Sequence, residues 1–136
     1  MLSTTRVALV AGLLLAALGA ITTLSSGSNT HAKVAATFAG SVAHEGVSAH
    51  SFTVQREGDV EVTLTGLRPA ATEKIGLGLG TPTAAGNCAL VEAIDSTRVT
   101  DRIGGTLRKG TYCVAVYDSG DVTSAPLDYT VSVTEE

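Results

Sequence analysis

The chain has 136 residues, with 13 acidic side chains against 9 basic ones and a net charge of −4. The basic side chains are scattered, apart from the adjacent pair Arg108 and Lys109. Nucleic-acid binders need clustered positive charge, so this composition argues against a nucleic-acid partner. The length allows one domain.

We expect residues 1–32 to be a signal peptide. A short start containing Arg6 precedes an apolar run over 7–21, and small and polar residues lead to Ala32. This order is typical of secretory signals. Cleavage after Ala32 leaves 33–136, a single domain with a net charge of −5. The alternative is an uncleaved anchor over 7–24, at the lower limit of what spans a bilayer.

From residue 36 onward, apolar and polar residues alternate with a period of two, which predicts strands. In the clearest segment Val60, Val62 and Leu64 alternate with polar residues. Regular spacing, with Gly, Pro and Asp at the joints, favours an antiparallel β-sandwich or jelly roll of seven or eight strands, preceded by a hydrophobic signal helix. The predicted strands are 36–43, 49–55, 60–67, 74–80, 88–93, 97–103, 111–118 and 127–134.

Two cysteines, Cys88 and Cys113, permit one intramolecular pairing, which we expect to form in an exported chain. Closing a loop of this size stabilises a protein by about 3–4 kcal/mol. Leu107, Gly110 and Tyr112 have the spacing of a tyrosine corner. Because Cys113 directly follows Tyr112, it points to the opposite face of its strand. We therefore expect the bridge to join neighbouring strands or a flanking loop, without crossing the core.

Five segments form a recognisable order along the chain: 38–40, 51–54, 58–67, 107–114 and 129–133. Taken in this order, they resemble the bacterial pre-peptidase C-terminal (PPC) domain family. Members of that family are β-sandwich modules appended to secreted proteases and other exported enzymes. The resemblance implies an accessory or binding role without catalysis, and some such modules bind calcium. The abundance of Ala and Gly also suggests a bacterial source.

Catalytic and metal-binding patterns are weak. There is no Gly-x-Ser-x-Gly motif, and 33–136 contains only two histidines, so we predict that the chain is not an enzyme. His44, Glu45 and His50 match no zinc spacing. The carboxylates of Asp118, Asp121 and Asp128 are candidate calcium ligands, but an Asp/Gly turn explains the segment more simply. No other cofactor is expected.

Gly76, Gly78 and Gly80 alternate along one predicted strand and leave one of its faces bare. We expect an aromatic ring, such as that of Tyr117, to pack there. Tyr117 is also the candidate exposed platform for a ligand, because the chain has no Trp.

The sequence thus predicts an exported, non-catalytic accessory or binding module in the periplasm, at the cell surface or outside the cell. Its expected partner is an extracellular or envelope ligand or protein, and it contacts a membrane only if 7–24 is retained. Two alternatives stay open. One is an envelope-anchored protein-interaction protein, and the other is a polysaccharide- or matrix-binding module assisted by calcium.

Overall fold

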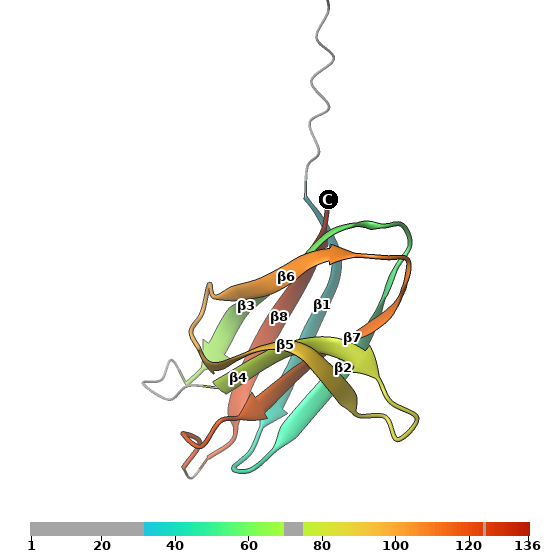
Figure 1. The fold of residues 1–136 in the computed structure, drawn as a ribbon. Coiled ribbons are helices and arrows are strands. Elements are labelled where there is room, and N and C mark those ends of the chain that lie inside the picture. Colours follow the sequence, from blue (N-terminus) through green and yellow to red (C-terminus); the bar gives the residue numbers. More distant parts are fainter. Residues whose placement is uncertain (1–31, 70–74, 124) are drawn as a thin grey trace, which may run out of the picture.

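A computed structural model describes residues 32–69, 75–123 and 125–136 (Figure 1). The predicted signal helix and anchor lie outside these residues. No helix in the described ranges is long and apolar enough to cross a membrane. The strands are β1 (Lys33–Val42), β2 (Val47–Val54), β3 (Gly58–Arg68), β4 (Ile75–Pro82), β5 (Cys88–Thr97), β6 (Arg102–Leu107), β7 (Gly110–Asp118) and β8 (Leu127–Glu135).

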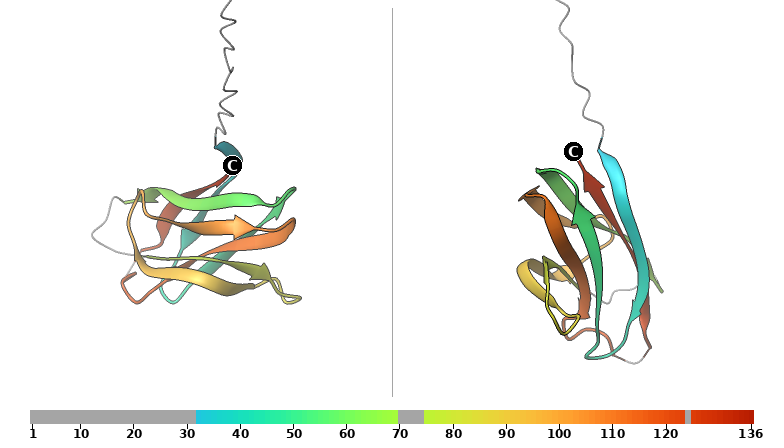
Figure 2. Two further views of the ribbon diagram at one scale, coloured as in Figure 1. Left: turned by 45° about the horizontal axis from the view of Figure 1, so that its top comes forward. Right: turned by 90° about the vertical axis from the view of Figure 1, so that its right-hand side faces the viewer.

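The strands form two four-stranded antiparallel sheets that pack face to face (Figure 2). The first sheet has the order β1-β8-β3-β6 and the second β2-β7-β4-β5, which is the order of a jelly roll. The predicted all-β sandwich is therefore confirmed. This topology places the sheet-end strands β1 and β2 on one side of the sandwich. It places the other two end strands, β5 and β6, on the opposite side.

The core lies between the sheets and follows the period-two pattern of the sequence. Val60, Val62 and Leu64 of β3 are at most 2% exposed, and Val131 of β8 is fully buried. The alternate residues of these strands face outward, as expected of sheets with one buried face. The second sheet contributes Phe52, Val54, Ile75, Leu77, Leu79, Val114 and Val116 to the same core.

The sixth predicted strand was wrong in its bounds. We expected it over 97–103 and ending before Gly104 and Gly105, whereas β6 runs through both glycines to Leu107. Thr97 instead ends β5, and residues 98–101 form the connection. The reason is a close backbone approach, because a Cβ on Gly104 would overlap the carbonyl oxygen of Val60 on β3. Glycine here permits the pairing that it usually interrupts.

The outer face of β4 is covered along its three glycines. The Tyr117 ring lies over Gly76, and the Leu90 side chain lies over Gly78. The backbone of Ala89 passes so close to Gly80 that a Cβ there would overlap it. The predicted packing of Tyr117 is thus confirmed, and the start of β5 folds over the outside of its neighbour.

This overlap explains the disulfide. Cys88 and Cys113 are bonded, with their Cα atoms 5.8 Å apart, although β4 lies between β5 and β7 in the sheet. The bridge avoids the core as expected, but it joins neither neighbouring strands nor a flanking loop, because Cys88 is the first residue of β5. It spans β4 because glycine allows β5 to pass over it. Cys113 is on the outer face of β7 and yet only 1% exposed.

Candidate functional site

The side of the sandwich formed by β5 and β6 is open. Within the described residues, β5 pairs only with β4, and β6 pairs only with β3. A groove of about 410 Å³ lies between them, and most of its lining is apolar. It is lined by Leu79, Thr81, Val91, Glu92, Gly104, Gly105, Leu107 and Tyr112.

Two apolar side chains of β5 are exposed, and one of them, Val91, lines this groove. Val91 is 81% exposed and Leu90 is 42% exposed. Sheet edges in soluble proteins are usually protected by charge or by covering segments, and exposed apolar groups at an edge often mark interaction sites. Neither residue is among the predicted site residues. The available signal was their adjacency, because two successive apolar residues in a strand cannot both face the core.

Tyr112 forms a fixed wall of the groove. Its hydroxyl donates a hydrogen bond to the carbonyl oxygen of Arg108 at 3.0 Å, four residues upstream. Its ring contacts that of Phe52, with the ring centres 6.0 Å apart. Leu107 packs against the core beside it, and Gly110 begins β7. Leu107 and Tyr112 of the predicted tyrosine corner therefore line the groove.

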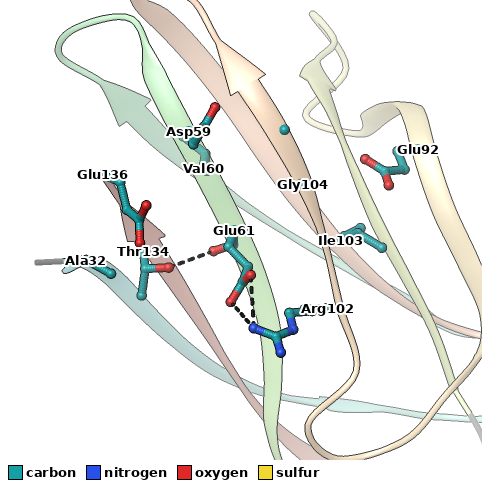
Figure 3. A pocket seen from close by; sticks show the side chains of 11 residues that line it. Ala32, Asp59, Val60, Glu61, Glu92, Arg102, Ile103, Gly104, Thr134 and Glu136 are labelled. Carbon is teal, nitrogen blue, oxygen red and sulfur yellow. Dashed lines mark hydrogen bonds and ion pairs between the residues drawn. The ribbon is translucent and has the colours of Figure 1, made fainter. Parts of the chain in front are cut away.

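A second hollow, of about 630 Å³, continues from the groove and is acidic (Figure 3). Both hollows are lined by Glu92, Gly104 and Gly105. Among the residues that the structure describes, Asp59, Glu61 and Glu136 also line the acidic hollow, and Arg102 is its one cation.

The charges in this hollow are unevenly matched. Arg102 lies 3.2 Å from the Glu61 carboxylate and so has its partner within the sheet. Figure 3 draws Glu92 on the other side of β6 from this pair. Within the described part of the chain, the Glu92 carboxylate has no hydrogen-bond or ion-pair partner. The hollow therefore keeps excess negative charge next to the apolar groove.

The segment that leads into β5 is ordered by its own bonds. The Thr83 N–H donates to the Asn87 carbonyl oxygen at 2.8 Å, and the Gly86 N–H donates to Thr83 at 3.0 Å. The Asn87 N–H also donates to the Thr83 hydroxyl at 3.1 Å. Cys88 follows directly and is bonded to β7. The exposed residues of β5 thus extend from a rigid, crosslinked hairpin.

Asp118, the first of the candidate calcium ligands, is bonded to backbone N–H groups. Asp118 accepts hydrogen bonds from the backbone N–H groups of Gly120, Asp121 and Val122 at 2.8–3.1 Å. It also accepts one from the Glu45 N–H at 2.8 Å. These bonds lower the pKa of Asp118 to about 2. The carboxylate closes a turn, as the simpler interpretation held.

No group of three His, Cys, Asp or Glu side chains in the described ranges is arranged to hold a metal ion. Asp121 and Asp128 are exposed on the turn and on β8. His44 instead contacts the carbonyl oxygen of Val122 through Nδ1 at 2.7 Å, next to Asp118. His50 contacts the Tyr129 hydroxyl at 2.6 Å and stacks on Phe38. Both histidines thus have structural partners.

Tyr117 packs as expected on the glycine face of β4 and is fixed there by a hydrogen bond. One face of its ring covers Gly76, and its hydroxyl donates to Asp95 at 2.6 Å. Burial, together with the bond and charge of Asp95, raises the pKa of Tyr117 to about 12. The use of Tyr117 as a ligand platform, and with it the carbohydrate alternative, stays a prediction.

No family model matches the chain, and no curated protein matches it. The resemblance to the PPC family therefore stays a prediction. Among solved structures, the chain is similar to PliG of Aeromonas hydrophila, a periplasmic inhibitor of g-type lysozyme. The TM-score is 0.55 at 16% sequence identity, over 76% of this chain and 87% of PliG. At this identity the likeness shows a shared β-sandwich fold.

Proposed function

We propose that this chain is an exported, non-catalytic module that binds another protein. The observation that carries the proposal is the open β5–β6 side, where an apolar groove lies between two sheet ends and Val91 is 81% exposed. Protein-binding surfaces combine a desolvated apolar centre with a polar border, and this side offers both. The Cys88–Cys113 disulfide suits an oxidising compartment outside the cytosol.

The shared fold with PliG supports the proposal as an analogy. PliG inhibits an enzyme, so a sandwich of this architecture can serve by binding a protein. A lysozyme is accordingly the first partner to test. The envelope-anchored alternative proposes the same kind of partner and differs only in whether residues 7–24 are retained.

Site-specific photo-crosslinking in the native host tests the proposal. A photoreactive residue replaces Val91 on the open side, and a control replaces exposed Thr37 on β1. We expect one discrete crosslinked protein from position 91 and none from position 37. The captured protein is then purified and titrated with the full chain and with the Val91→Glu variant, and we expect the variant to bind at least tenfold more weakly.

A parallel assay measures the lysis of bacterial cell walls by g-type lysozyme in the presence of the full chain. Slowed lysis that Val91→Glu relieves would identify the partner class. If neither position captures a protein, and the chain is inert towards g-type lysozyme, the proposed function is wrong.

A further inference from the structure

We propose that the groove and the acidic hollow together bind an extended segment of a partner protein, in which apolar and basic side chains alternate. This inference rests on the proposed function and adds the binding surface and the chemistry of the partner. Recognition would occur by strand addition along the outer edge of β6, a common mode of peptide binding at sheet edges.

The backbone of β6 is accessible where the two hollows meet. Gly104 and Gly105 are both exposed, and no atom lies within 4 Å of where a Cβ of Gly105 would be. Neither glycine carries a side chain that would obstruct a second backbone at this edge. Within the described residues, β6 has only β3 as a strand partner, so its other edge is available for pairing.

The linings on either side of the glycines set the side-chain preference. Val91, Leu107 and Tyr112 line the groove and suit an apolar side chain. Glu92 and the hollow beyond it suit a Lys or Arg, because Glu92 has no partner in the described chain. Successive side chains of a strand point in opposite directions, so one extended segment over Gly104 and Gly105 can serve both hollows.

Two other occupants fit less well. A second copy of this chain would bring the same carboxylates together, and like charges at an interface reduce affinity. The chain's own residues 25–31, which precede Ala32 at the acidic hollow, contain no Lys or Arg. Charge complementarity therefore favours a basic partner from another protein.

The test uses the full chain, isotopically labelled and purified in the form that its host produces. The probe is a short synthetic peptide of alternating Val and Lys. Its binding is measured from the chemical-shift changes of the labelled chain's backbone amides. We expect saturable shifts centred on Gly104, Gly105 and Glu92, with an affinity that falls as salt rises. A peptide of alternating Val and Glu, and one of alternating Ser and Lys, should bind at least tenfold more weakly.

Matched variants separate groove binding from general attraction. Gly105→Leu fills the groove at a position where a Cβ meets no atom, so this variant should fold normally. Its affinity for the Val/Lys peptide should be at least tenfold lower than that of the parent chain. Thr37→Leu adds the same bulk to the exposed surface of β1, the opposite sheet end, and should leave the affinity unchanged. Glu92→Lys should reverse the preference and favour the Val/Glu peptide.

Several results would overturn the inference. Peptide shifts spread over both sheets, or unchanged binding by folded Gly105→Leu, would exclude this groove. A dimer in solution that Val91→Glu dissociates would identify a second copy as the occupant. A last outcome separates the two proposals. If position 91 captures a protein that the purified chain binds, but the Val/Lys peptide does not shift the Gly105 amide signal, the proposed function holds and this inference fails.

Discussion

The two sides of the sandwich differ in how far side chains cover them, although each side is formed by a pair of sheet-end strands. On the β1–β2 side, His50 of β2 stacks on Phe38 of β1, with ring centres 4.8 Å apart, and contacts Tyr129 of β8. Asp118 binds the Glu45 N–H of the connecting turn. On the β5–β6 side the side chains leave a groove, and Val91 faces solvent.

The difference shows which side of the sandwich keeps exposed apolar surface. The β1–β2 side is joined by hydrogen bonds and a ring stack that link both sheets, which is how small sandwiches protect their ends. The β5–β6 side is instead stabilised by a disulfide on the outer face of the second sheet. This bond fixes β5 over β4 and leaves the groove side of β5 exposed. A side that is rigid but uncovered suits binding.

Removing the disulfide should have the largest effect. The double variant Cys88→Ala/Cys113→Ala loses a crosslink over 25 residues, and we expect the free energy of unfolding to fall by about 3–4 kcal/mol. Denaturant titration measures this loss. Hydrogen exchange should show faster exchange in β5 than in β1. Uniform acceleration across both sheets would contradict a local role for the bridge on the open side.

Gly80→Ala tests the passage of β5 over β4. The new methyl group would overlap the backbone of Ala89, and such overpacking costs about 1–3 kcal/mol of unfolding free energy. Gly105→Ala is the matched control, since its methyl group meets no atom within 4 Å, and its stability should be equal or slightly higher. Equal losses in the two variants would show that β5 does not need the close approach.

Asp118 should make the stability of the β1–β2 side sensitive to acid. Four backbone N–H bonds lower its pKa to about 2, so its contribution is fully present above about pH 4 and is lost as the pH falls towards 2. Asp118→Asn should lower the melting temperature at pH 7, and its difference from the parent should shrink towards pH 2. A difference that stays constant with pH would mean that the charge of Asp118 is not involved.

His50 should also make stability depend on pH, more weakly than Asp118 does and in a higher pH range. Burial lowers the pKa of His50 below 6.5, so the folded chain binds this proton less readily than the unfolded chain. The resulting stability is present above about pH 6.5 and decreases as the pH falls through the lowered pKa. His50→Gln should cost about 1 kcal/mol at pH 7.5, for the bond to Tyr129, and less at pH 5. Thermal unfolding across this range measures both.

Val91→Glu should have the smallest effect on folding. The side chain is 81% exposed, so the free energy of unfolding should change by no more than about 0.5 kcal/mol. Its effect on partner binding, described above, should be large by comparison. A strongly destabilised Val91→Glu would show that this residue supports the fold and is not kept exposed for a partner.

The sequence by itself determined the strands, because alternation of apolar and polar residues is a local property that one buried face imposes. Val60, Val62 and Leu64 were assigned to the core in this way, and so was the packing of Tyr117 on the glycine face. The disulfide followed from the number of cysteines. It was predicted as a bridge that avoids the core, since Cys113 alternates with Val114.

Only the tertiary structure decided which strands the bridge joins and which side of the sandwich stays open. Both depend on strand order, which brings residues together that are far apart in the chain. The sequence placed Gly104 beyond the end of a strand, but the close backbone of β3 lets β6 continue through it. The sequence left Asp118 as a turn residue or a candidate calcium ligand, and the structure shows its carboxylate bonded to the backbone of 120–122. Glu92 and Gly105 became neighbours only because β5 and β6 end different sheets on the same side.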